Sequence, residues 1–284
     1  MPGKPFKTIA MTVAVSPNLE ANIAEALRVK EALGQRLILI HIGERTAKGE
    51  EKLKEVFEKY QIDQENTDLI WKNGDQVNAI LKVCAEKKVD LLVASATPRE
   101  GLLKYYRGSI ARGLVRKSNC SILLMTYPNE LKSKYPKIVV NGLDHPKTAY
   151  TIEMAIRVGE CFQSTELVIA EEVVPSRVAK HMEDDKNLEQ AKKGIQKKEA
   201  KRIENILTGI KMPERLKVSQ KYLFGKPGYS IGHFTEQFQA NLLVMNSPDT
   251  KLGFLDRVFT HDLEYILSEL PSDLLIVHSS EPSL

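Results

Sequence analysis

The chain of 284 residues has no long apolar run and few cysteines. No stretch approaches the roughly 18 consecutive apolar residues that cross a bilayer, so no membrane insertion is expected. The N-terminal residues lack the apolar core of a signal peptide. The three cysteines, Cys84, Cys120 and Cys161, are widely spaced and match neither a zinc motif nor a disulfide framework. These absences predict a cytoplasmic protein with reduced thiols.

Sequence motifs of common enzyme classes are also missing. There is no GxxxxGK(S/T) phosphate loop, no GxGxxG after the first strand, no HExxH and no GxSxG. The six histidines form no ligand-spaced pair, so neither a metal site nor an enzyme is expected, with weak ATP hydrolysis as an alternative. The 41 basic and 37 acidic side chains are well mixed, which argues against nucleic acid as a partner.

The sequence does contain one unit that occurs twice. Arg28 and Arg157 lie in matching helical patterns 129 positions apart, whereas Leu91 and Leu242 begin matching strands 151 positions apart. The second copy therefore carries about 22 extra residues, and a repeat of this length is a duplicated domain rather than a solenoid. We predict a first domain at 1–128, a linker at 129–136 and a second domain at 137–284. The insertion, near 176–207, is expected to be a long, exposed, charged helix. Its sparse apolar stripe would consist of Leu188, Ile195, Ile203 and Ile206.

Short apolar runs alternate with helical patterns in both halves, which predicts parallel strands joined by helices. The expected strands are Ile9–Val15, Leu37–Ile40, Thr67–Trp71, Leu91–Ala94, Ile122–Met125, Ile138–Val140, Leu167–Ala170, Leu216–Leu223, Leu242–Met245 and Leu274–Val277. The expected helices of the first half are Asn18–Leu33, Gly49–Tyr60, Asp75–Lys88 and Ser109–Lys117. Asn18 and Asp75 stand where helix caps are needed.

The order of elements and three local sequences resemble the universal stress protein family in its tandem two-domain form. The segments are Leu39–Ile42, Gly74-Asp75 with Val89–Val93, and Gly108–Ala111 with Asn119–Leu124. The resemblance implies two flavodoxin-like (adenine nucleotide alpha hydrolase-like) α/β domains, each a five-stranded parallel sheet between helices. It also implies that Ile122–Met125 and Leu274–Val277 pair, giving an intramolecular pseudo-dimer; a further homodimer stays open.

Nucleotide-binding members of that family use Gly-x2-Gly-x9-Gly-Ser/Thr after the fourth strand and an Asp after the first. Glycine lets backbone N–H groups approach phosphate, and the last pair opens a helix whose N-terminus favours anions. This chain departs from that pattern in both halves. The first half has Ser95, Pro98, Gly108 and Ser109, with Ala14 at the Asp position. The second half has Asn246, Asp249, Phe259 and Thr260, with Leu143, or Asp144 one residue later, at the Asp position.

No cofactor is therefore expected, and ATP or AMP in the first domain is the alternative. There, Arg99, Gly108 and Ser109 are the candidate binding residues, with Lys104 and Arg107 as further cations. In the second half a small polar pocket is a hypothesis, and its residues would be Asp144, His145, Asn246 and His261.

The leading functional prediction is a non-catalytic, stress-associated regulatory or adaptor protein with degenerate nucleotide motifs and an unidentified protein partner. One alternative is an adenine-nucleotide sensor that uses the first domain only. Another is a regulatory partner of a membrane transporter.

Overall fold

The computed structural model describes residues 3–95, 109–126, 135–182, 187–250, 257–258 and 261–279. The chain divides into two compact units. The first contains residues 1–134, 247–258 and 273–284, and the second contains residues 135–246 and 259–272. The predicted domain boundaries, at residues 128 and 137, follow the duplication in the sequence. They stay a prediction.

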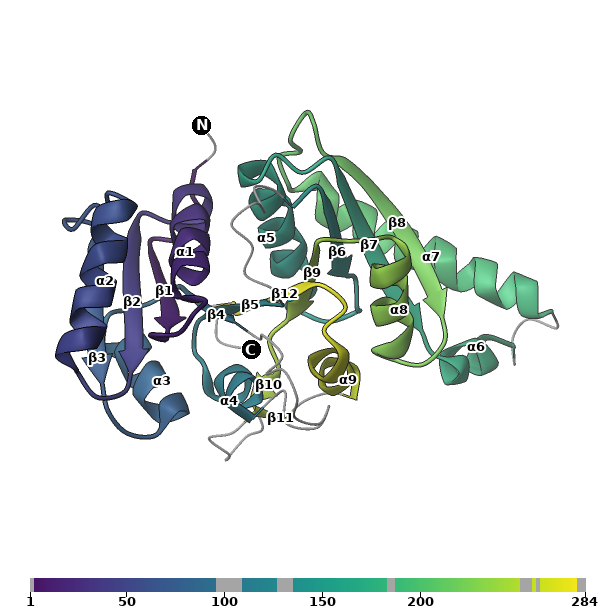
Figure 1. The fold of residues 1–284 in the computed structure, drawn as a ribbon. Helices are drawn as coiled ribbons and strands as arrows, with labels where there is room; N and C mark the ends of the chain where they lie inside the picture. The colour runs from purple at the N-terminus through teal and green to yellow at the C-terminus, as the bar shows by residue number, and fades with distance from the viewer. Residues whose placement is uncertain are drawn as a thin grey trace. The chain divides into compact units, whose positions relative to one another are not determined.

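The first unit follows the predicted alternation of strands and helices (Figure 1). Its elements are β1 (Thr8–Val13), α1 (Leu19–Leu33), β2 (Arg36–Ile42), α2 (Ala47–Lys59), β3 (Thr67–Lys72), α3 (Gln76–Glu86), β4 (Leu91–Ser95), α4 (Ser109–Lys117), β5 (Ser121–Met125), β10 (Asp249–Thr250), β11 (Arg257–Val258) and β12 (Asp273–Val277). Strands β3-β2-β1-β4-β5 are neighbours in that order and all parallel. This is the five-stranded parallel sheet that the sequence predicts.

The second unit repeats this arrangement. Its elements are β6 (Lys137–Asn141), α5 (Thr148–Cys161), β7 (Glu166–Val173), α6 (Pro175–Met182), α7 (Leu188–Thr208), β8 (Lys217–Phe224), α8 (Tyr229–Gln237), β9 (Leu242–Asn246) and α9 (His261–Glu269). Strands β9-β6-β7-β8 are neighbours and parallel. In each unit the chain turns back at the first strand of the copy, between β1 and β4 and between β6 and β9. Right-handed crossovers then place helices on both faces, and the carboxyl edge beside this switch is where such sheets bind ligands.

The expected pairing of the two final strands is present within the first unit. β12 runs antiparallel to β5, with Leu275 opposite Leu123. Asp273, which is 1% exposed, accepts hydrogen bonds from the backbone N–H (2.9 Å) and the hydroxyl (2.8 Å) of Thr126. This pairing removes the free edge that β5 would otherwise present.

The insertion differs from the single exposed helix that the sequence predicts. It forms two helices, α6 and α7, and α7 buries the residues Ala191, Ile195, Glu199 and Ile203. These lie four positions apart, so they share one face of the helix. Leu188, expected in the apolar stripe, is 42% exposed, and the charged Glu199 takes a buried place instead.

Helix starts were predicted with mixed success. Asp75 caps α3, because its carboxylate accepts a hydrogen bond from the N–H of Asn78 at 2.9 Å. Asn18 occupies the N-cap position of α1, but its side chain makes no capping hydrogen bond. The predicted place of this helix start is therefore confirmed, and the capping bond is not.

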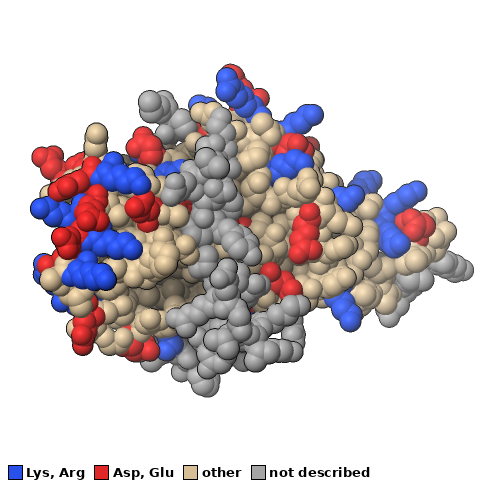
Figure 2. Space-filling view, viewed as in Figure 1, with Lys and Arg blue, Asp and Glu red and all other residues tan. Residues whose placement is uncertain are grey.

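Acidic and basic side chains are interspersed over the described part of the face in Figure 2. Among the described residues, no helix combines the length and the apolar character that a membrane span requires.

Candidate functional site at the carboxyl edge of the second sheet

The carboxyl ends of β6 and β9 meet at the switch point of the second unit, and protein groups bridge them there. Thr148, the first residue of α5, is fully buried, and its hydroxyl donates to the Leu143 carbonyl at 2.5 Å. The same hydroxyl accepts a hydrogen bond from Asn246 Nδ2 at 3.1 Å. Asn246 Oδ1 is buried and has no hydrogen-bond partner among the described residues. The side-chain nitrogen of Asn246, at the end of β9, therefore donates to a group of the protein itself.

The loop between β6 and α5 is held by further internal bonds. Asn141 Oδ1 accepts from the N–H of Leu143 at 3.1 Å, and His145 Nδ1 accepts from the N–H of Lys147 at 3.2 Å. As an acceptor, His145 Nδ1 carries no proton, so the neutral ring has its proton on Nε2. These bonds fix the loop that follows the first strand of the copy.

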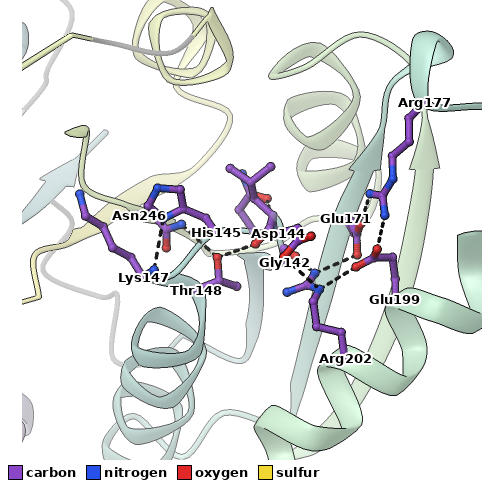
Figure 3. Close-up of polar contacts among 12 residues, drawn as sticks. Gly142, Asp144, His145, Lys147, Thr148, Glu171, Arg177, Glu199, Arg202 and Asn246 are labelled. Atoms are coloured by element: carbon purple, nitrogen blue, oxygen red, sulfur yellow. Dashed lines mark hydrogen bonds and ion pairs between the residues drawn. The ribbon is translucent and has the colours of Figure 1, made fainter. Parts of the chain in front are cut away.

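Beside this loop lies a buried charge cluster, drawn in Figure 3, formed by Glu171 of β7, Arg177 of α6, and Glu199 and Arg202 of α7. Each carboxylate contacts both guanidinium groups. Arg177 lies 2.9 Å from Glu171 and also contacts Glu199. Arg202 lies 2.6 Å from Glu199 and 3.1 Å from Glu171. Glu171 is 2% exposed and Glu199 is fully buried, so both anions depend on these cations for compensation.

The two carboxylates differ in acidity because their surroundings differ. Burial, with repulsion from Glu199 as the next cause, raises the pKa of Glu171 to about 7. Burial also acts to raise the pKa of Glu199, but hydrogen bonds from Arg202 and Arg177 outweigh it, so this pKa lies below its usual range. Glu199 is therefore the stable anion of the cluster, and Glu171 is the carboxyl group that takes up a proton near neutral pH.

The cluster also reaches the loop. Arg202 Nη2 donates to the carbonyl of Gly142, and Arg202 Nε lies 3.8 Å from Asp144 (Figure 3). Asp144 itself is 61% exposed. The inserted helix α7 thereby fastens the β6–α5 loop to the rest of the unit.

The strand register shows which residues of the first unit correspond to the residues around the Arg202–Gly142 bond. Ile9 pairs with Leu37 and Ile138 pairs with Leu167, so Gly142 corresponds to Val13 and Glu171 corresponds to His41. In the first unit His41 Nδ1 lies 3.1 Å from the Val13 carbonyl, and its ring packs 4.3 Å from that of Trp71. In the second unit Arg202, held by Glu171, bonds the corresponding carbonyl.

The carboxylate of Glu172 lies at the N-terminus of α8 in the second unit. Gly228, with φ 77°, precedes α8, and the N–H groups of Gly228 and Ile231 donate to Glu172 at 2.9 Å each. A helix N-terminus favours an anion, and here the carboxylate of Glu172 supplies it.

The predicted residues are brought together only in part. Asn246 is linked to the β6–α5 loop through Thr148, whereas Asp144 lies beside Arg202. His261 begins α9, and its side chain is not among the described ones. The hypothesis of one pocket from Asp144, His145, Asn246 and His261 stays a prediction, and the contacts link only Asn246 to the start of α5.

The candidate nucleotide residues of the first half lie largely outside the described residues. This applies to Pro98, Arg99 and Gly108, while Ser109 is the first residue of α4 and Ser95 the last residue of β4. Within the described part of the chain, no group of three or more His, Cys, Asp or Glu side chains could hold a metal ion.

Sequence reasoning missed the charge cluster. Arg177 and Glu199 are 22 positions apart, and Arg202 is 60 positions from Gly142. The available signal was Glu199 itself, which stands midway between Ile195 and Ile203 on an otherwise apolar face.

The switch points and crossovers define a doubly wound α/β protein with a duplicated unit. Residues 5–125 match the model of the universal stress protein family, so this part of the chain is a domain of that family. No curated protein sequence matches the chain.

Solved structures give the same fold over the whole chain. A universal stress protein from Archaeoglobus fulgidus DSM 4304 is 14% identical, with a TM-score of 0.67 over 95% of this chain and 97% of that one. A functionally unknown protein from Pseudomonas aeruginosa PAO1 is also 14% identical, with a TM-score of 0.66 over 96% and 92%. The cytoplasmic domain of a prokaryotic cation chloride cotransporter is 15% identical, with a TM-score of 0.51 over 96% of each chain.

Proposed function

We propose that this chain is a non-catalytic regulatory protein that acts through contacts with other proteins. The observation that supports the proposal is that side chains of the protein itself occupy the carboxyl edge of the second sheet. Arg202 bonds the Gly142 carbonyl, Thr148 bonds the loop and Asn246, and Glu172 takes the N–H groups before α8. Apart from Asn246 Oδ1, these groups satisfy one another and leave little polar capacity for a ligand.

A nucleotide bound in the family manner does not fit this edge. Leu143 corresponds by register to Ala14, the position where the family pattern has its Asp, and an apolar side chain cannot accept hydrogen bonds from adenosine. The N-terminus of α8, the helix after the third strand of the copy, already holds the Glu172 carboxylate and so offers no additional site for an anion. The second unit is therefore proposed to be a protein-binding domain.

The test is a titration of the full chain with magnesium and ATP, followed by its melting temperature. A site occupied at a hundredfold excess over Kd stabilises the folded state by about 2.7 kcal/mol. We expect no shift at millimolar ATP and no release of phosphate. A shift that Gly108→Asp abolishes would establish the nucleotide sensor in the first domain, with Arg99, Gly108 and Ser109 as its residues. A shift that survives Gly108→Asp would place a nucleotide in the second unit and contradict the proposal.

The likeness to the cotransporter domain supports a second candidate, a regulatory partner of a membrane transporter. Affinity purification of the tagged full chain from detergent-solubilised cells tests it. For this candidate we expect a transporter to be recovered with the chain. A surface variant in the described part of either unit should reduce that recovery. Recovery of water-soluble partners alone would exclude it and leave the adaptor.

A further inference from the structure

Two of the three cysteines, far apart in the sequence, line one pocket of the first unit. Cys84 belongs to α3, and Cys120 directly precedes β5. The pocket has a volume of about 230 Å³, and its lining includes Lys88, Lys117 and Asn119. Since a water molecule takes about 30 Å³, a small polar oxidant can enter.

The two thiols line the same pocket, and each shifts the pKa of the other. Both are nearly buried, with 6% of Cys84 and 9% of Cys120 exposed. Ser118 adds a second contact, because its hydroxyl oxygen lies 3.2 Å from Cys120 Sγ. Among the described residues no further His, Cys, Asp or Glu joins the two thiols in a metal-binding group, so the pair is suited to oxidation rather than to coordination.

We propose that Cys84 and Cys120 are a peroxide-sensitive dithiol that closes to a disulfide between α3 and the start of β5. This site is independent of the proposed function and belongs to the first unit. It would make the first unit respond to an oxidant of the hydroperoxide class.

The environment assigns different roles to the two sulfurs. The interaction with Cys84, together with hydrogen bonds from Ser118 and the backbone at Leu92, lowers the pKa of Cys120 below its usual range despite burial. The interaction with Cys120, followed by burial, raises the pKa of Cys84. We therefore assign Cys120 as the attacking sulfur and Cys84 as the resolving sulfur.

The reaction balances with one hydroperoxide. The Cys120 thiolate attacks one peroxide oxygen, the O–O bond breaks, and the leaving hydroxide takes the Cys84 proton or one from solvent. This leaves a sulfenic acid on Cys120. The sulfur of Cys84 then attacks Cys120 Sγ, and the S–O bond breaks as water leaves. Two thiols and one hydrogen peroxide give one disulfide and two waters. Once Cys120 is a neutral sulfenic acid, the anion that held the proton on Cys84 is gone, so the second step is favoured.

The test uses the full chain, reduced and then exposed to hydrogen peroxide in its native state. Free thiols are alkylated in denaturant, and the protein is analysed by intact mass and by peptide mapping. We expect the loss of two hydrogen atoms, a Cys84–Cys120 cross-linked peptide, and an alkylated Cys161. Dithiothreitol should restore the original mass.

Variants separate this outcome from incidental oxidation. Cys161→Ser should keep the cross-link, and Cys84→Ala should stop at a sulfenic acid on Cys120 that dimedone captures. The wild-type peptide map stands even if a variant fails to fold. The proposal is overturned if Cys84 and Cys120 both remain alkylated, if the disulfide contains Cys161, or if urea-unfolded protein forms the cross-link as readily as native protein.

Discussion

At the scale of single residues, Glu199 is the side chain on which the charge cluster depends. It is fully buried and contacts Arg177 and Arg202. Glu199→Ala leaves one carboxylate between two cations, and we expect the free energy of unfolding to fall by about 3 kcal/mol. Urea denaturation measures this loss. Glu204→Ala, at an exposed position of the same helix, should change it by at most about 0.5 kcal/mol. Equal effects of the two variants would show that the cluster adds no stability.

Glu171 gives the cluster a pH dependence of opposite sign to that of an ordinary ion-paired carboxylate. Its pKa is raised from 4.5 in the unfolded chain to about 7, so the folded protein binds an extra proton between these values. The stabilisation from this proton is complete below about pH 4.5 and is lost as the pH rises through about 7. Glu171→Gln stays neutral and should remove this part of the pH dependence.

The measurement is the free energy of unfolding of wild type and Glu171→Gln from about pH 5 to about pH 8. The wild type should lose stability relative to the variant across this range. A difference between the two proteins that stays constant with pH would contradict the raised pKa.

At the scale of elements, α7 packs through a small apolar cluster in addition to its ion pairs. Ile195 is fully buried and forms a cluster with Val173 of β7 and Val178 of α6. Ile195→Ala should therefore lower the free energy of unfolding by about 3 kcal/mol, because it leaves a cavity. Leu188→Ala, at a position 42% exposed, is the control and should have little effect in the same denaturation. If both variants behave alike, α7 does not pack as described.

Helices and strands could be predicted from local sequence signals, whereas long-range contacts between side chains could not. Continuous apolar runs gave the strands, and Asp75 with its spacing to Asn78 gave the start of α3. The buried face of α7 was predicted at Ile195 and Ile203 only. Ala191 and Glu199 were missed, since they resemble surface residues until the arginines of two helices are brought beside β7. Long-range pairing decides such positions, and a single sequence does not contain it.

At the scale of the whole molecule, the duplication explains both what repeats and what differs. Register places the same backbone carbonyl at Val13 and Gly142, yet His41 bonds one and Arg202 bonds the other. The insertion that the sequence locates at 176–207 supplies that arginine. The repeat therefore predicted the sheet order and the place of the candidate edge, while the polar groups that fill the edge depend on residues present in one copy only.

The junction of the final strands carries the last prediction. Asp273 at the start of β12 accepts two hydrogen bonds from Thr126, which directly follows β5. The two residues are 147 positions apart, so only the folded chain brings them together. Asp273→Ala leaves the Thr126 donors without this acceptor, and we expect the free energy of unfolding to fall by about 2 kcal/mol.

Thr126→Val removes one of the two bonds and should have about half that effect, while Glu269→Ala at an exposed position should have almost none. Amide hydrogen exchange of β5 should quicken in the order Glu269→Ala, Thr126→Val, Asp273→Ala, because the loosened end exposes the strand edge to water. Unchanged exchange in Asp273→Ala would mean that the strand ladder alone, with Leu275 opposite Leu123, holds β5 and β12 together.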